Sequence, residues 1–379
     1  MGNRGRGEGT IYRRPDGRWS AQLRLEYGQR KTLYGRTRAE VQGKLRQLQR
    51  DREQGVAVGA PSISVGKYLA RWLDEAARLK VRPRTFAGYS LNVRRLDPHI
   101  GRIRLAQLTP QAIQGAYARL LANGLAPRSV QQAHVVLHSA LRQAMRWGMV
   151  GRNAADGVIV PRAQPSEMAT LTSEQLHVLF ESTEGQALHA LWVVLATTGM
   201  REGEALGLKW SDIDPEKARL VVRRALQRHA SVGFVMVDPK TARSRRTIHL
   251  SRIAIQALAD HRARQREMRL LAGASWRADF GDLVFCSRTG LPMGSSWPNV
   301  VFRRELAKAG LPRVRIHDLR HTAATLLLTR GVHPKVVQDM LGHSTVTLTL
   351  DTYSHVTPAL HKEAADHMDA LLGEGHSSS

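Results

Sequence analysis

Short alternating runs and longer helical patterns of hydrophobic residues divide the chain into three parts. Residues 1–55 contain brief runs of alternating apolar and polar residues around a Pro15-Asp16-Gly17 turn, which is typical of a β-hairpin. A third short strand is expected at residues 31–34, and apolar residues then recur at helical spacing from Thr37 onward. The pattern predicts a small three-stranded sheet with one helix, and it leaves open a solvated leader instead.

Residues 62–160 carry a helical pattern throughout. They follow an uncharged run of small residues, GVAVGAPS, which is typical of a linker. Thr109-Pro110 supplies an N-cap and a proline at the first helical position, and Asn123-Gly124 ends the helix that they begin. After Pro127, apolar residues recur at helical spacing through another helix. These residues are therefore predicted to form an all-helical second domain.

A proline-rich segment, residues 161–170, separates this domain from a third one. Thr172 and Gln175 form a capping box, which marks the start of a helix. Residues 170–365 are predicted to be mostly helical, with β character on both sides of a basic turn, and residues 366–379 to be a disordered tail. The whole chain is expected to be mainly α with small β elements, an α+β protein.

The charge of the chain is strongly positive. Lys and Arg number 57 against 32 Asp and Glu, which gives a formal net charge of +25 and a sequence pI near 11.2. Nucleic acid is the common partner of such a surface, because neutralised phosphates release counterions. A generic basic protein remains the alternative. Arginines that are candidates for DNA contact, or else for a solvated face, are Arg13, Arg14, Arg18, Arg82, Arg84, Arg94 and Arg95.

The sequence gives no sign of a membrane segment. It has no run of eighteen or more apolar residues, and no apolar stretch follows the basic and glycine-rich start MGNRGRGEGT. Neither a membrane span nor a signal peptide is therefore expected. The protein is predicted to be cytoplasmic.

Four segments of the third domain carry residues suited to chemistry on a phosphate. In TTGMREGEALGLKW, Arg201 and Glu204 lie one helical turn apart, which by itself indicates only a surface ion pair. In PKTARSRRTIHL, Lys240 is expected on the turn of a basic hairpin. His317 and Arg320 are three residues apart in HDLR, so on a helix they project from one face and can bind the same anion.

The fourth segment is LGHSTVTLTLDTYSH, residues 341–355. Its TVTLTL run alternates like a strand. It contains His343 and Tyr353, and Tyr353 is the only tyrosine after Tyr117. The alternation of residues by itself therefore does not decide the secondary structure of this segment.

These segments also allow two other interpretations. A zinc site made of His317, His321, His343 and His355 lacks the ligand spacing of zinc motifs, and the chain has one cysteine. A helix-turn-helix in AATLLLTRGVHPKVVQDMLGHSTVTLTL would make the chain a non-catalytic DNA-binding regulator. That alternative leaves the arginine of the first segment, the lysine of the second and the isolated tyrosine unexplained.

Taken in order, the four segments resemble the tyrosine recombinase (phage integrase) family, in its form with an arm-binding domain. The family pattern is an arginine in TG-x-R-x-x-E, a lysine on a β-hairpin, an H-x-x-R pair, a histidine in LGH and a tyrosine shortly after it. The matching positions are Arg201 with Glu204, Lys240, His317 with Arg320, His343 and Tyr353. The resemblance also covers the order of domains, and it implies a short helix rather than a strand at TVTLTL.

The resemblance implies a reaction at a DNA phosphodiester without a metal or other cofactor. Nucleophilic attack adds negative charge to the phosphate oxygens, and Arg201 and Arg320 can each present a planar fork to two of them. His317 and His343 add hydrogen bonds, and His317 can also act on the proton of the nucleophile.

By the same resemblance, Tyr353 is the nucleophile. A phenol has a pKa of about 10, so it needs a positive surrounding to attack at neutral pH. Lys240 is implied as the general acid for the departing 5′ oxygen, and Glu204 as a supporting residue. The expected product is a 3′-phosphotyrosyl link and a free 5′-hydroxyl.

The implied partners are double-stranded DNA attachment sites and further copies of the chain in a tetramer. Residues 1–55 would bind arm-type DNA, residues 62–160 would be a SAM-like core-binding domain, and residues 170–365 the catalytic domain. A host DNA-bending protein and an excision or directionality factor are also expected, in the bacterial cytoplasm with the nucleoid. A relaxing topoisomerase of the same chemistry is the remaining alternative, and the separate N-terminal domain argues against it.

Overall fold

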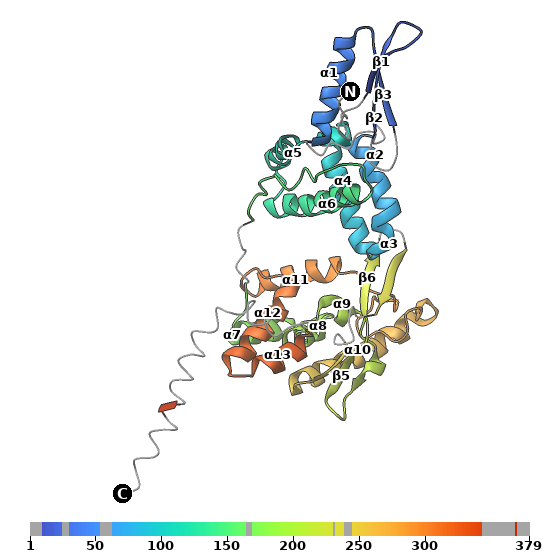
Figure 1. Ribbon diagram of the computed structural model, residues 1–379. Coiled ribbons are helices and arrows are strands. Elements are labelled where there is room, and N and C mark those ends of the chain that lie inside the picture. Colours follow the sequence, from blue (N-terminus) through green and yellow to red (C-terminus); the bar gives the residue numbers. More distant parts are fainter. Residues whose placement is uncertain are drawn as a thin grey trace. The chain divides into compact units, whose positions relative to one another are not determined.

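The chain divides into two compact units, Met1–Pro165 and Ser166–Ser379. Figure 1 shows the elements of the computed structural model. The residues that the structure describes are 10–24, 30–53, 63–163, 169–229, 232–238, 245–342 and 368–369. Within these ranges, no helix has both the length and the apolar character needed to cross a bilayer.

The first unit begins with a three-stranded antiparallel sheet of order β1-β2-β3. Its elements are β1 (Thr10–Arg13), β2 (Trp19–Arg24), β3 (Arg30–Gly35) and the helix α1 (Arg38–Glu53). Gly17 adopts φ +79° in the β1–β2 turn, and the Asp16 carboxylate accepts a hydrogen bond from the Arg18 backbone N–H at 3.1 Å. The sheet and helix predicted from residues 1–55 are confirmed.

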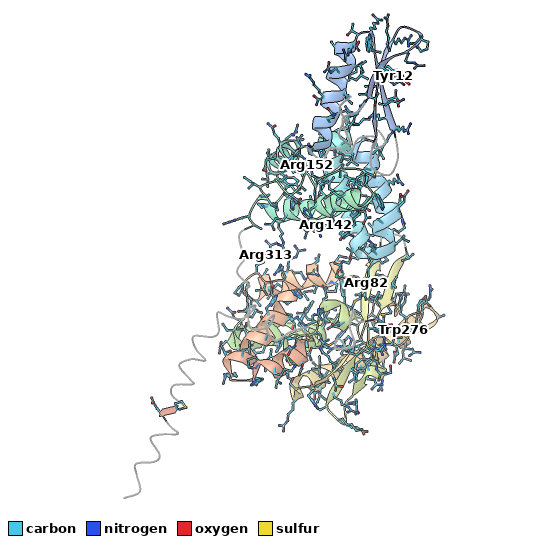
Figure 2. All side chains as sticks on the ribbon, in the orientation of Figure 1. Tyr12, Arg82, Arg142, Arg152, Trp276 and Arg313 are labelled. Atoms are coloured by element: carbon cyan, nitrogen blue, oxygen red, sulfur yellow. The ribbon has the colours of Figure 1, made fainter. Side chains whose placement is uncertain are left out.

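The two faces of this small sheet differ in chemistry. One face packs against α1, and the two elements share a small apolar core. Its cross-strand neighbours from the sheet are Ile11, Ala21 and Leu33. Tyr12 and Tyr34 flank Ser20 on the other face, where the two tyrosine residues are 41% and 50% exposed. Figure 2 shows Tyr12 projecting outward from the sheet. One face is therefore fully used for packing, and the other carries aromatic rings in solvent.

Residues 63–163 form a helical bundle with a separate core. Its elements are α2 (Val65–Trp72), the π-helical η2 (Leu73–Ala77), α3 (Arg78–Lys80), α4 (Pro83–Ile100), η3 (Leu105–Gln107), α5 (Pro110–Ala122) and α6 (Pro127–Arg146). The predicted caps of α5 are present, because the Thr109 hydroxyl accepts from Ala112 N–H at 3.2 Å and Gly124 follows the helix at φ +81°. The buried Tyr68 hydroxyl donates to the Ala140 carbonyl at 2.5 Å, which ties α2 to α6.

The second unit is also mostly helical. Its helices are α7 (Ser173–Thr183), α8 (His189–Thr198), α9 (Glu202–Leu206), η4 (Trp210–Asp212), α10 (Arg252–Ala272), η6 (Gly273–Ser275), α11 (Ser296–Lys308), α12 (Ile316–Thr329) and α13 (Pro334–Leu341). The capping box predicted at Thr172 and Gln175 opens α7, with reciprocal hydrogen bonds of 3.0 and 3.3 Å.

Helix α8 is the centre of this unit. Nearly all of its residues are buried, as expected for a helix that is apolar on every side, and α7, α9, α10 and α12 pack around it. Trp192 of α8 contacts Phe302 of α11 with ring centroids 4.8 Å apart. The end of α8 is thereby fixed inside the unit, and the candidate site begins there.

Two small antiparallel sheets flank the helices. The strands are β4 (Ile213–Asp214), β5 (Arg219–Val222), β6 (Ala225–His229), β7 (Gly233–Val237) and β8 (Arg246–His249). The pairing order is β4-β5-β8 in one sheet and β6-β7 in the other. The strands that precede and follow Lys240, β7 and β8, therefore pair with different partners. The predicted hairpin of these two strands is therefore wrong, because β8 pairs with β5. Lys240 itself lies outside the described residues.

Gln265 of α10 is a buried residue with hydrogen bonds to several segments, and its replacement is predicted to destabilise the second unit. Its amide N–H groups donate to the carbonyls of Leu283 and Val284 at 2.9 and 3.0 Å, and its oxygen accepts from Trp210 Nε1 at 2.6 Å. Gln265→Leu removes the partners of Trp210 Nε1 and of the Leu283 carbonyl, while the Val284 carbonyl keeps its bond from His261 Nε2 at 2.8 Å. We expect a loss of roughly 1–3 kcal/mol of unfolding free energy for each group left unsatisfied. Urea unfolding monitored by tryptophan fluorescence measures it.

Gln256→Leu on the same helix is the matched control. Gln256 is exposed and bonds only the Asp260 side chain one turn away, so this variant is expected to unfold like the wild type. Equal midpoints for the two variants would contradict the role assigned to Gln265.

Candidate active site

The candidate site is built on the turn that joins α8 to α9. Gly199 ends α8 with φ +61°, and Arg201 is the N-cap residue of α9. The Glu204 carboxylate reaches back to this turn, where it accepts from Arg201 N–H at 3.0 Å and from Arg201 Nη1 at 2.9 Å. Bonds within the local sequence TGMREGE therefore help to orient the arginine.

Gly199 is needed at this turn for a second reason. A Cβ atom built on Gly199 would lie 2.5 Å from Leu341 Cδ2, closer than real Cβ contacts allow. The last residues of α13 therefore pack directly against the turn, although they lie far along the chain. Glycine permits both the left-handed conformation and this close approach.

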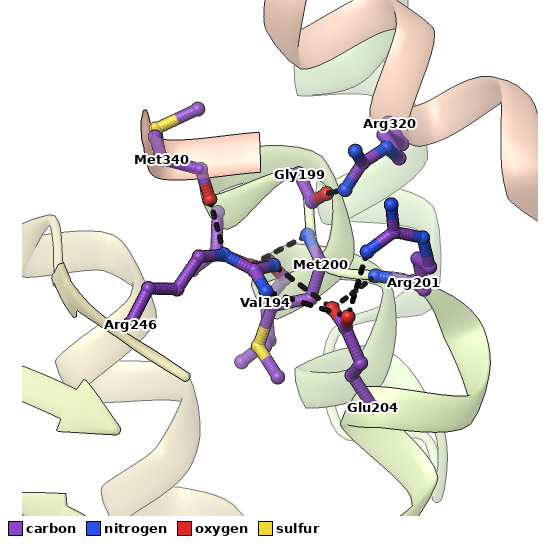
Figure 3. Close-up of polar contacts among 9 residues, drawn as sticks. Val194, Gly199, Met200, Arg201, Glu204, Arg246, Arg320 and Met340 are labelled. Carbon is purple, nitrogen blue, oxygen red and sulfur yellow. Dashed lines mark hydrogen bonds and ion pairs between the residues drawn. The ribbon is translucent and has the colours of Figure 1, made fainter. Parts of the chain in front are cut away.

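Arg320 reaches the same turn from α12. It is 3% exposed, and its Nη1 donates to the Gly199 carbonyl at 2.7 Å. Figure 3 shows the guanidinium groups of Arg320 and Arg201 beside one another at the turn. The structure therefore brings together two arginines that the sequence separates widely, as the predicted phosphate-binding role of Arg201 and Arg320 requires.

His317 lies one turn before Arg320 on α12, and it is predicted to be uncharged at neutral pH. Burial lowers its pKa from the ordinary histidine value, and the positive charges of Arg320, Arg315 and Arg201 lower it further against the opposing effect of Asp318. Its ring contacts that of His321 edge to face, with centroids 5.1 Å apart. Burial also lowers the pKa of His321, to about 4. A neutral His317 can exchange a proton with a nucleophile or a phosphate oxygen.

Arg246 is a buried member of the site that the sequence interpretation missed. Its Nη2 and Nη1 donate to the two carboxylate oxygens of Glu204 at 2.8 and 3.3 Å, and its Nε donates to the Met340 carbonyl at 2.6 Å. Figure 3 shows these contacts. A signal was present, because on a strand Arg246 has the same parity as the apolar Ile248 and Leu250 and so faces the interior.

The pKa of Glu204 reflects this environment. Burial by itself would raise it, but the hydrogen bonds and positive charge of Arg246, with the backbone and charge of Arg201, outweigh burial and lower it. Glu204 is therefore a carboxylate at neutral pH, and it is shared by two arginines.

Three of the predicted catalytic residues, Lys240, His343 and Tyr353, lie outside the described residues. His343 directly follows Gly342, the left-handed C-cap of α13 at φ +69°. The sequence PALHKEAADHMDALL, residues 358–372, is also expected to form a C-terminal helix. This segment, the predicted helix at TVTLTL and the tail fall outside the described residues, apart from Met368 and Asp369, which are helical.

The predicted DNA-contacting arginines lie in the first unit. Six of them are exposed, namely Arg13, Arg14, Arg18, Arg82, Arg84 and Arg94. Arg95 is half-buried and donates from Nη1 to Asn92 Oδ1 at 3.3 Å. Figure 2 shows Arg82 on the helical bundle together with Arg142 and Arg152, which the sequence interpretation did not single out.

The second unit also has a basic pocket of about 490 Å³, lined by Asn299, Phe302, Arg303, Arg313, Val314 and Arg315. Its three arginines come from α11 and from the segment that leads into α12. In the part of the chain that the structure describes, no three His, Cys, Asp or Glu side chains are placed to hold a metal ion. Arg201, Arg246 and Arg320 supply the positive charge of the described part of the site, which suits a phosphodiester.

A mostly helical, strongly basic protein with paired arginines and an uncharged histidine has the features expected of a class that performs chemistry on nucleic-acid phosphates. Comparison with known families names the group: the Phage integrase family matches residues 169–359, and the Phage integrase N-terminal SAM-like domain matches residues 64–121. The chain belongs to the phage integrase family.

Curated relatives carry consistent names. A tyrosine recombinase XerC-like protein of Caldanaerobacter subterraneus subsp. tengcongensis is 29% identical over 90% of this chain and 92% of its own length. An integrase of Saccharopolyspora erythraea is 27% identical over 97% of both chains. The transposase from transposon Tn916 of Enterococcus faecalis is 25% identical over 83% of this chain and 79% of its own.

Solved structures share the fold. The Tn1549 transposon integrase, in complex with transposon right end DNA, has a TM-score of 0.70 at 23% identity, over 80% of this chain and all of that one. A lambda integrase dimer bound to a COC′ core site has a TM-score of 0.58 at 18% identity, over 90% of this chain and 94% of that one.

These findings confirm the family, the fold class and the enzyme class predicted from the sequence. The chain is a tyrosine recombinase of the phage and transposon integrase type, and nothing supports the alternative of a non-catalytic regulator. The roles of individual residues remain predictions.

The shared Glu204 carboxylate predicts a specific dependence of stability on pH. Its folded-state pKa lies below the unfolded value of about 4.3, so its stabilisation is present above that pH and is lost as pH falls through the folded pKa. Glu204→Gln is expected to lose up to roughly 3–5 kcal/mol of unfolding free energy at pH 7, and less below pH 4. Denaturant unfolding at several pH values measures this difference.

Glu202→Gln in the same helix is the control, because burial raises the pKa of Glu202. Ionised Glu202 then costs stability at neutral pH, so this variant is expected to be at least as stable as the wild type at pH 7. A pH-independent loss for Glu204→Gln would contradict the assignment.

Proposed function

We propose that this integrase cleaves and rejoins DNA at two attachment sites through a 3′-phosphotyrosyl intermediate, and so integrates or excises a mobile element. The observation that carries the proposal is the convergence of Arg201, Arg320 and His317 at the Gly199 turn. Two guanidinium forks on one side of a rigid turn suit the two non-bridging oxygens of a phosphodiester. Family membership supports the reaction class.

The residue roles follow from where charge develops during the reaction. Attack on the phosphorus adds negative charge to the phosphate oxygens, and Arg201 and Arg320 stabilise it without moving, because Glu204 and the Gly199 carbonyl already hold them. His317, uncharged when free of DNA, takes the proton of the nucleophile or bonds the phosphate. Preorganised donors of this kind lower the barrier more than mobile surface arginines would.

The remaining roles are assigned by the position of residues in the family pattern. Tyr353 is the nucleophile, and its attack releases a 5′ oxygen that Lys240 protonates. His343 adds a hydrogen bond to the phosphate. The phosphotyrosyl bond retains the energy of the phosphodiester, so a second strand can displace the tyrosine without ATP.

The first unit would provide recognition. Residues 1–55 would bind arm-type DNA through the exposed Tyr12 and Tyr34 face and its arginines, since cationic and aromatic side chains bind phosphates and bases. Residues 62–160 would form the core-binding domain, which together with the catalytic domain at 170–365 would hold the core site. Residues 366–379 would be a tail.

The complete reaction would use a tetramer on DNA, as two sites with two strands each must be cut. A lambda integrase tetramer bound to a Holliday junction shares this fold and supports the proposal. The C-terminal helix would dock on a neighbouring protomer or on its own domain. A host DNA-bending protein and a directionality factor would assist in the bacterial cytoplasm.

The test of the function is formation of a covalent adduct. Nicked duplexes that tile the DNA flanking the coding region are incubated with the protein, and adducts that survive denaturant are separated by electrophoresis. We expect one tile to give an adduct with the wild type and none with Tyr353→Phe, because phenylalanine lacks the attacking oxygen. An adduct that persists in Tyr353→Phe, or no adduct from any tile, would overturn the proposal.

Arg201→Lys and Arg320→Lys are predicted to reduce the cleavage rate by roughly a hundredfold or more while DNA affinity stays nearly unchanged. Lysine keeps the charge but offers no fork to two oxygens. Single-turnover cleavage of the reactive tile and its equilibrium binding separate the two quantities.

Arg262→Lys is the matched control, because Arg262 is exposed on α10 and stacks over the Trp210 ring, remote in sequence from the proposed site. It should cleave at the wild-type rate. A comparable loss in all three variants would show that the Gly199 turn has no special role.

A further inference from the structure

Arg246 joins three segments of the second unit that are far apart in sequence. It extends from the inner face of β8, binds both oxygens of Glu204 in α9, and donates to the Met340 carbonyl at the end of α13. Its side chain is 6% exposed and that of Glu204 is 8% exposed. The pair is therefore held in low dielectric, where its geometry is rigid.

The end of α13 is fitted to the Arg246 guanidinium. A Cβ atom built on Gly342 would lie 3.1 Å from Arg246 Nη1 and 3.2 Å from its Cδ. The glycine that ends α13 therefore lets the backbone lie against the guanidinium. Arg246 fixes the point from which the chain continues to His343.

Glu204 has two oxygens and two arginine partners. The Arg201 side chain donates one hydrogen bond to it, from Nη1 to Oε1, whereas the Arg246 side chain donates to both oxygens. Without Arg246, the carboxylate could turn and bind Arg201 with both oxygens, as carboxylates commonly bind arginine. Arg201 would then have fewer N–H groups for a phosphate, although its side chain is 43% exposed at present.

We propose that Arg246 is a positioning residue for DNA cleavage: it restrains Glu204 so that Arg201 keeps its outer N–H groups for the phosphate, and it anchors the end of α13 beside them. This inference rests on the proposed function. It assigns to Arg246 no contact with DNA. Its effect is on the rate of the chemical step and not on affinity.

The test compares Arg246→Lys with Arg224→Lys. Arg224→Lys is the matched control. Arg224 binds both oxygens of Asp212, a carboxylate in the same unit that is as buried as Glu204. Arg224 is bonded to none of the proposed catalytic residues. Lysine retains the charge in each case but cannot bond several acceptors as a fork. Cleavage of the reactive nicked duplex, its binding and thermal unfolding are measured for both variants.

We expect Arg246→Lys to bind the duplex within about twofold of the wild type and to cleave it roughly ten to a hundred times more slowly, because small misplacements at a reacting centre have effects of this size. Arg224→Lys should cleave at nearly the wild-type rate even where it lowers the unfolding temperature as much. A wild-type rate for Arg246→Lys, or equal losses in the two variants, would overturn the inference.

A double variant, Glu204→Gln with Arg246→Met, removes both buried charges and separates positioning from stability. Replacing a whole buried pair commonly restores the stability that single changes lose. If Arg246 matters only for folding, cleavage returns with the unfolding temperature, and the inference is wrong. If the Glu204–Arg246 pair positions Arg201, the rate stays low although the stability returns. Adduct formation by the wild type and its absence in Tyr353→Phe show separately whether the proposed function holds.

Discussion

A carboxylate buried between two guanidinium groups organises the catalytic unit. An isolated buried carboxylate would cost several kcal/mol, so the fold that encloses Glu204 must also supply Arg201 and Arg246. Because Arg246 also donates to the Met340 carbonyl, the Glu204–Arg246 pair fixes α9, β8 and the end of α13 to one another. The α8–α9 turn and the segment that leads to His343 therefore share one anchor.

The Glu204 carboxylate also reduces the repulsion between positive charges that is common to phosphate-binding sites. Several cations placed together repel one another until the anion arrives, and that repulsion opposes folding. Here Glu204 offsets Arg201 and Arg246, the Gly199 carbonyl accepts from Arg320, and Asp318 pairs with Arg315 at the start of α12. The histidines contribute no charge at neutral pH, since burial lowers the pKa of His317 and of His321. The site can thus be preorganised without DNA.

Local chemistry made much of the fold predictable. The Thr109 cap, the Thr172–Gln175 capping box and the turn at Gly17 depend on residues within four positions of one another, and each is present. The H-x-x-R spacing likewise placed His317 and Arg320 on one helix. By contrast, the strands on either side of Lys240 were wrongly paired, because a strand's pattern shows which face is buried but not which strand lies beside it.

The sequence by itself determined the domain-scale pattern of helices and strands, the basic character and, through its ordered motifs, the family. Tertiary structure decided how the site is assembled. Arg246 meets Glu204 across 42 positions and Met340 across 94, and Arg320 meets Gly199 across 121. Contacts between residues so far apart cannot be predicted from the periodic pattern of the sequence, because they depend on where packed elements bring side chains together. An arginine in an apolar strand position indicated burial, but only the fold revealed the carboxylate that makes this burial possible.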